Sequence, residues 1–193
     1  MCISVTGQCD IIHFTVDLVH LRRFTQQAKL KFMAESLAFS KTSGRETLYK
    51  EIIPQIKSLV EGESDLIANL ANITAVLKEA FGFLWVGFYL EKGGQLVLGP
   101  FQGPLACTRI NFDQGVCGHA YTTQEIIIIP NVDEFPGHIV CSSASRSEIV
   151  LPIFDKSGEV FGVLDVDSDR LSDFSETDAQ GLSRITDIIT KIL

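Results

Sequence analysis

The chain has 193 residues, of which 46% are hydrophobic and 21% are charged, and its formal net charge is −8. This length has room for one domain with a full core, and the composition is typical of a globular protein that folds in water. The acidic balance argues against a nucleic-acid surface, and no apolar run reaches the roughly 18 residues of a membrane helix, so neither partner is expected.

The first 45 residues differ in charge from the rest of the chain. Residues 1–45 carry six basic and three acidic side chains, whereas residues 46–193 carry ten and 21. We therefore expect an N-terminal extension over residues 1–45, partly disordered or not native, since Met33 offers an alternative start. Residues 46–193 are expected to form the single folded, catalytic domain.

Two amphipathic helices are predicted at the start of this domain. Apolar residues recur at helical spacing over residues 47–61 and again from residue 64, and Gly82 suits a C-terminal cap for the second helix. Pro54 indicates either a kink in the first helix or its true beginning.

The hydrophobic period changes to two over residues 84–90. Alternation places a core face against a second face that carries Trp85, Gly87 and Tyr89. The glycine leaves a gap between two rings, and this gap either receives a ligand or is simply covered by the rings.

A hairpin turn then leads into a second strand at residues 96–99. The long segment after it has one regular run, residues 126–129, which predicts a short buried strand ended by Pro130. Long loops in a compact domain are usually functional, and we expect these loops to fold over the sheet as a lid.

A strand pair and a closing helix complete the chain. Residues 146–154 and 159–167 alternate as strands around a short turn, and Ser175 with Asp178 forms a variant of the capping box. The order of elements predicts an α+β fold, in which terminal helices pack on one face of a mostly antiparallel sheet and ligand-covering loops lie on the other.

Three of the five cysteines, Cys107, Cys117 and Cys141, fall in predicted turns. Thiols in loops are candidates for chemistry before packing. The odd number of cysteines and the lack of a signal-like start favour a reducing compartment, so a cytoplasmic protein is expected. The pattern is typical of a thiol enzyme.

The motifs of the domain resemble those of the free methionine-(R)-sulfoxide reductases, a GAF-domain family. The matching stretches are Trp85-Val-Gly-Phe-Tyr89, Gly99 to Ile110, Gly115-Val-Cys-Gly118, Phe135-Pro-Gly-His138, Cys141, Ser145 to Ile149 and Gly162 to Ser168. The resemblance implies a GAF fold and thiol-dependent reduction of the free R epimer. It also implies a thioredoxin-like reductant and no cofactor.

The family resemblance also implies roles for particular residues. Cys141 would be the attacking thiolate, Cys107 the resolving thiol and Cys117 an auxiliary cysteine. The substrate pocket positions match Trp85, Tyr89, Glu148, Asp165 and Asp167.

This chemistry gives each group a task. A thiolate attacks the sulfoxide sulfur while the oxygen takes up a proton, methionine leaves, and the resulting sulfenic acid condenses with a second thiol. The acids suit the substrate's ammonium group, and because three close carboxyls cannot all ionise cheaply, one can donate the proton. Glu148 is favoured as the donor because it lies near Cys141 in the sequence, and the rings of Trp85 and Tyr89 would wall the methyl-sulfur end.

Two alternatives remain open. A zinc site could use Cys107, Cys117, His119, His138 and Cys141, but these residues contain no C-x-x-C pair, and no metal is expected. The other alternative is a non-catalytic GAF module that binds a small molecule or senses redox state. The oligomeric state stays open, a homodimer included.

Overall fold

The computed structural model describes residues 37–40, 42–137 and 143–193. Predictions on residues 1–36, on His138 and on Cys141 therefore concern positions outside the described part of the chain. Leu37 and Phe39 pack against the helix-side core, and the Ser40 backbone N–H donates to Glu51. The predicted boundary at residue 45 remains a prediction.

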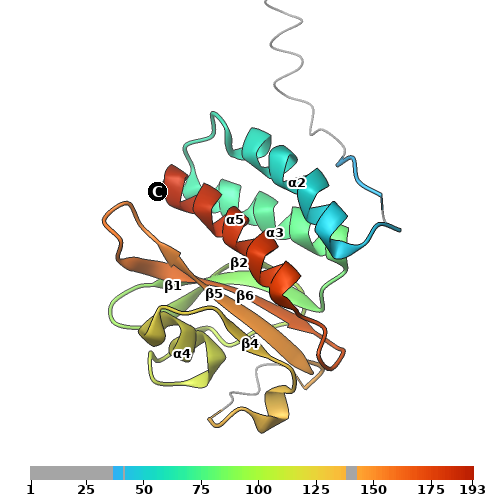
Figure 1. The fold of residues 1–193 in the computed structure, drawn as a ribbon. Coiled ribbons are helices and arrows are strands. Elements are labelled where there is room, and N and C mark those ends of the chain that lie inside the picture. Colours follow the sequence, from blue (N-terminus) through green and yellow to red (C-terminus); the bar gives the residue numbers. More distant parts are fainter. Residues whose placement is uncertain (1–36, 41, 138–142) are drawn as a thin grey trace, which may run out of the picture. The chain divides into compact units, whose positions relative to one another are not determined.

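An antiparallel sheet forms the centre of the fold (Figure 1). Within the described residues it has six strands in the order β3-β2-β1-β6-β5-β4. Their bounds are β1 (Trp85–Glu91), β2 (Leu96–Gln102), β3 (Arg109–Ile110), β4 (Ile127–Ile129), β5 (Ser147–Phe154) and β6 (Val160–Ser168).

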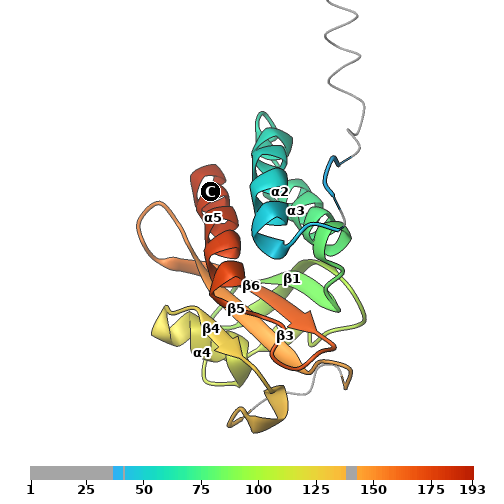
Figure 2. The same ribbon diagram turned by 45° about the vertical axis from the view of Figure 1, so that its right-hand side comes forward.

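In the described part of the chain, three helices cover one face of this sheet, and a shorter helix lies on the opposite face (Figures 1 and 2). The covering helices are α2 (Arg45–Val60), α3 (Leu66–Phe81) and α5 (Glu176–Ile192), and the helix opposite is α4 (Gly115–Thr123). A short 3-10 helix, η1 (Val132–Glu134), follows β4. The predicted α+β architecture is confirmed.

Local chemistry sets the ends of these helices. The Asp65 carboxylate accepts from the Ala68 backbone N–H at the start of α3, and Gly82 ends that helix in the left-handed region with φ 68°. The first helix begins at Arg45, well before Pro54, so Pro54 does not mark its start.

Asp178 joins the N-terminal ends of α2 and α5. Its fully buried carboxylate accepts from Arg45 at 2.7 Å, from the Tyr49 hydroxyl at 3.1 Å and from the Ser175 backbone N–H at 2.9 Å. The last of these contacts is half of the predicted capping box. A buried carboxylate with several donors locks the two helices in one relative position.

The alternation predicted for the first strand is confirmed by two apolar clusters. Val86, Phe88 and Leu90 belong to the cluster between the sheet and the three helices. Trp85 and Tyr89 belong to a second cluster on the face that carries α4. The candidate site residues of this strand therefore face away from the main helical layer.

Two sequence predictions for the central segment were wrong. Residues 115–123 form α4 rather than a loop. The sequence did not indicate this helix because its small and polar residues carry little helical periodicity. The strand at residues 127–129 is half-buried rather than buried, because β4 is an edge strand of the sheet. Among the helices of the described residues, none combines the length and the hydrophobicity that a membrane span requires.

Candidate active site

The strand register brings the predicted pocket residues onto one face of the sheet. Asp167 lies opposite Trp85 of β1 on one side and opposite Glu148 of β5 on the other. Asp165, two residues earlier on β6, lies opposite Gly87. Because directly paired residues point to the same side of a sheet, all three acids and the Trp85 ring share the α4 face.

The indole ring of Trp85 lies over Gly87, two residues further along β1. A β-carbon at Gly87 would come within 2.3 Å of Trp85 Cη2 and 2.5 Å of Phe101 Cβ. The gap predicted at Gly87 is therefore filled by the indole itself, which stacks between Phe101 and Tyr89 with ring centroids 5.4 and 6.0 Å away. Glycine is needed here for a close approach of a ring to the backbone.

The three acids form a crowded and largely buried group. Burial raises the pKa of Glu148 well above its usual range, and the charges of Asp165 and Asp167 raise it further. Burial likewise raises the pKa of Asp165, with Asp167 adding to the effect. Burial raises the pKa of Asp167 to about 6, although a hydrogen bond from Ser145 acts in the opposite direction. The predicted crowding is present.

One oxygen of this group has no partner. Asp165 Oδ1 is buried and makes no hydrogen bond, and the same is true of Trp85 Nε1. None of the described Lys, Arg or His side chains forms an ion pair with the three acids. Such groups are costly to bury without compensation, and the unpartnered Asp165 oxygen favours a ligand that carries a cationic donor.

Cys117 enters the same group from α4. It is a free thiol, 3% exposed, and it hydrogen-bonds to Asp165. Burial, followed by the charge of Asp165, raises the pKa of the Cys117 thiol well above its usual range. The expectation of a loop cysteine was wrong at this position, because Cys117 lies in α4, and the raised pKa makes Cys117 a poor attacking thiolate.

The backbone of α4 explains how Cys117 reaches the acids. A β-carbon at the next residue, Gly118, would come within 2.6 Å of the Asn111 carbonyl oxygen. Only a glycine allows α4 to lie this close to the preceding loop. The Gly115-Val-Cys-Gly118 stretch thus places its thiol by packing, a tertiary effect that turn composition did not indicate.

Tyr89 connects the pocket to the segment of Cys107. Its hydroxyl donates to the Cys107 carbonyl oxygen at 2.9 Å. Cys107 is disulfide-bonded in this structure and its side chain packs against the cluster of Trp85 and Tyr89. Cys141, the predicted attacking residue, lies outside the described residues.

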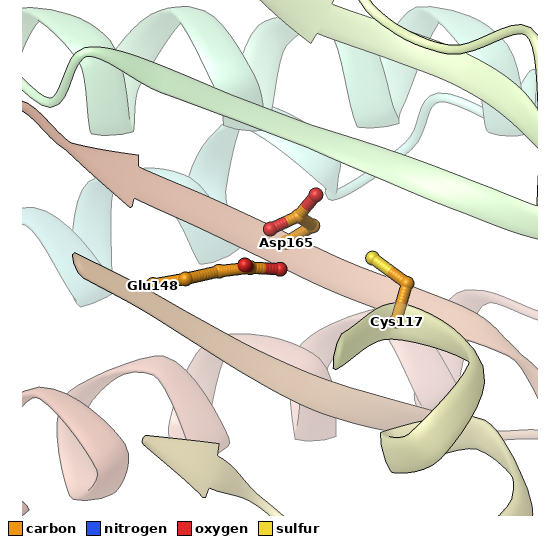
Figure 3. A group of neighbouring side chains, drawn as sticks. All are labelled: Cys117, Glu148 and Asp165. Carbon is orange, nitrogen blue, oxygen red and sulfur yellow. The ribbon is translucent and has the colours of Figure 1, made fainter. Parts of the chain in front are cut away.

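Cys117, Glu148 and Asp165 are the described residues that could hold a metal ion (Figure 3). Each offers one ligand atom, and these atoms lie within 4.8 Å of one another. This group shares only Cys117 with the cysteine and histidine set considered from the sequence. Strand register and helix packing create it, so spacing along the chain could not have found it.

This chain is similar in sequence to a known domain family and to characterised proteins. A model of the GAF domain matches residues 65–193. GAF domain-containing protein A of Dictyostelium discoideum is 54% identical over 158 residues, which make up 81% of this chain and 99% of that protein. The free methionine-R-sulfoxide reductase of Escherichia coli is 42% identical over 146 residues, 75% of this chain and 88% of that protein.

This chain is also similar in fold and sequence to solved structures. The X-ray structure of free methionine-R-sulfoxide reductase from Neisseria meningitidis in complex with its substrate is 53% identical, with a TM-score of 0.79. The match covers 81% of this chain and 94% of that one. The similarity thus extends over most of the length of each protein compared.

Proposed function

Since this chain belongs to the GAF-domain family of free methionine-R-sulfoxide reductases, we propose that it reduces free methionine-(R)-sulfoxide to methionine through Cys141, Cys107 and Glu148. The observation that carries the proposal is the buried group of Glu148, Asp165 and Asp167 on the face walled by Trp85. A pocket with three acids and no described cation suits a small cationic substrate.

The acids select a free amino acid. The three acids have no cationic partner among the described side chains, and the ammonium group of free methionine sulfoxide supplies one. The unpartnered Asp165 Oδ1 accepts a hydrogen bond from this ammonium group. A peptide-bound methionine sulfoxide has no ammonium group at this position. The same acids therefore discriminate against oxidised residues within proteins.

The reductive step uses a thiolate and an acid. The Cys141 thiolate attacks the sulfoxide sulfur, the oxygen takes up a proton and transfers to the cysteine sulfur, and methionine leaves a Cys141 sulfenic acid behind. Glu148 supplies the proton, because its burial and its two acidic neighbours keep it protonated. Trp85 and Tyr89 wall the methyl-sulfur end of the pocket, where sulfur and ring contacts are favourable.

The recovery step uses the second thiol. The Cys107 thiol attacks the sulfenic sulfur, water leaves, and the two cysteines are joined by a disulfide. The disulfide bond at Cys107 in this structure supports that role. Cys117 is auxiliary, because its buried thiol stays protonated. A thioredoxin-like dithiol in the cytoplasm returns the disulfide to two thiols.

The experiment follows methionine release from free methionine-(R)-sulfoxide with dithiothreitol or thioredoxin as reductant. The S epimer and N-acetylmethionine-(R)-sulfoxide are run beside it, because they test the stereochemistry and the need for the ammonium group. We expect turnover of the free R epimer alone and no turnover by Cys141→Ser.

Cys9→Ser serves as the matched control, because Cys9 is outside the motif set, and it should turn over as the wild type does. A folded, fully reduced wild type without turnover would overturn the proposal. The chain would then be better explained as a GAF module that binds a small molecule or senses redox state.

A further inference from the structure

Three side chains from separate elements converge in the pocket: Cys117 from α4, Glu148 from β5 and Asp165 from β6 (Figure 3). Their exposed fractions are 3%, 6% and 7%, so the donor atoms are shielded from water. Figure 3 shows the Cys117 sulfur and the Glu148 carboxyl group pointing toward Asp165. The three donor atoms lie within 4.8 Å of one another.

The geometry points to a metal site, and we propose that the reduced, substrate-free pocket binds one Zn²⁺ ion through Cys117 Sγ, Glu148 and Asp165. Tetrahedral zinc with ligand bonds of about 2.0–2.3 Å holds its ligand atoms about 3.3–3.8 Å apart. The three donor atoms already lie within 4.8 Å of one another, so small side-chain rotations bring them to this spacing.

The unpartnered oxygen is an independent sign of a ligand at this place. Only 7% of Asp165 is exposed to solvent, yet its Oδ1 atom makes no hydrogen bond. No described basic side chain forms an ion pair with any of the three groups. A divalent cation compensates the unpartnered acceptor and takes the place of the protons that otherwise neutralise the crowded acids.

The donor set decides which metal fits. One thiolate with two carboxylates is too soft for Mg²⁺ or Ca²⁺, which take oxygen ligands, and it suits Zn²⁺ or its spectroscopic substitute Co²⁺. Binding displaces the Cys117 thiol proton and the protons held by the buried Glu148 and Asp165 carboxyl groups, and these protons are released to solvent. Three protein ligands leave a fourth position for water.

Zinc in this position occupies Asp165, which we assign to the substrate's ammonium group, and Glu148, which we assign as the proton donor. Zinc is therefore a competitive inhibitor, a consequence that rests on the proposed function, whereas the binding itself does not. A thiol enzyme regulated in this way would pause when free zinc rises and resume when a chelator removes the ion.

The test uses the full chain, reduced with a phosphine so that no added thiol binds the metal. Titration with Co²⁺ should produce a near-ultraviolet sulfur-to-cobalt charge-transfer band that saturates at a single equivalent. Zn²⁺ should abolish the band, and competition with a chromophoric chelator gives the zinc affinity. Free methionine-(R)-sulfoxide or methionine should displace Co²⁺ from the wild type.

Variants separate this site from the other thiols. Cys117→Ser should lose the charge-transfer band, and Asp165→Asn should weaken zinc binding at least about tenfold, since even the loss of an outer-shell partner costs 10- to 100-fold. A chain with both Cys107→Ser and Cys141→Ser should keep the band. Circular dichroism checks that each variant is folded.

The outcomes distinguish the two proposals. A band that persists in Cys117→Ser, or wild-type protein that takes up no Co²⁺, overturns the metal site even if the enzyme turns over. Co²⁺ uptake that depends on Cys117 without any methionine release supports the metal site and overturns the proposed function.

Discussion

The indole ring of Trp85 lies over Gly87, at the place where any side chain on residue 87 would stand. Gly87→Ala must move either this ring or Phe101, because the new β-carbon would approach both within 2.5 Å or less. We expect the free energy of unfolding to fall by about 1–3 kcal/mol, as for other overpacked sites, and kcat/KM to fall with it. Urea unfolding and methionine release measure the two effects.

Gly44→Ala is the matched control for this substitution. A β-carbon at Gly44 meets no atom within 4 Å, and the residue is the N-cap of α2, where the change costs less than about 1 kcal/mol. Equal stability and activity of Gly87→Ala and the wild type would mean that residue 87 does not hold the ring in place.

Glu148→Gln tests the proton donor. The amide keeps the size of the side chain but cannot release a proton to the sulfoxide oxygen, so kcat should fall by about 10²- to 10⁴-fold. Glu159→Gln, which alters an exposed residue in the turn before β6, should leave kcat unchanged. If Glu148→Gln lowered only the affinity for substrate, the carboxyl group would bind the ammonium group rather than donate the proton.

Cys107→Ser tests the resolving thiol. Without reductant, the variant should release about one equivalent of methionine and then stop, because the sulfenic acid on Cys141 has no second thiol to attack it. Trapping with dimedone and mass spectrometry detects that sulfenic acid. Thioredoxin-supported turnover should be lost. Its persistence would assign resolution to another cysteine.

The acid group should make stability depend on pH. Because burial raises the pKa of Asp167 from 3.8 to about 6, the folded state holds this proton more tightly than the unfolded state does. Its contribution to stability is full below about pH 4 and is lost as the pH rises through about 6. Asp167→Asn removes this dependence and should gain about 2 kcal/mol relative to the wild type between pH 4 and 7.

Urea unfolding of substrate-free protein across this pH range measures the difference. Asp187→Asn alters an exposed carboxylate of α5 and should follow the pH slope of the wild type. A parallel slope for Asp167→Asn and the wild type would contradict the raised pKa.

Much of the fold was predictable because its signals are local. The alternation of residues 84–90 separated Trp85 and Tyr89 from the core face, and capping residues indicated the ends of α3 and α5. The α+β class followed from the order of these segments, and the resemblance of the motifs indicated the GAF type. The candidate acids were predicted to be close because Asp165 and Asp167 share a strand face by period alone.

Local sequence patterns therefore predicted most of the elements, α4 and β3 excepted, together with the faces of the strands and the residues available for chemistry. Three features depend on tertiary packing: Cys117 is buried on α4, Trp85 fills the space over Gly87, and one oxygen of Asp165 has no partner. These features could not be predicted because periodicity and capping depend on residues close together in the sequence, whereas strand register and helix packing join residues far apart in the chain.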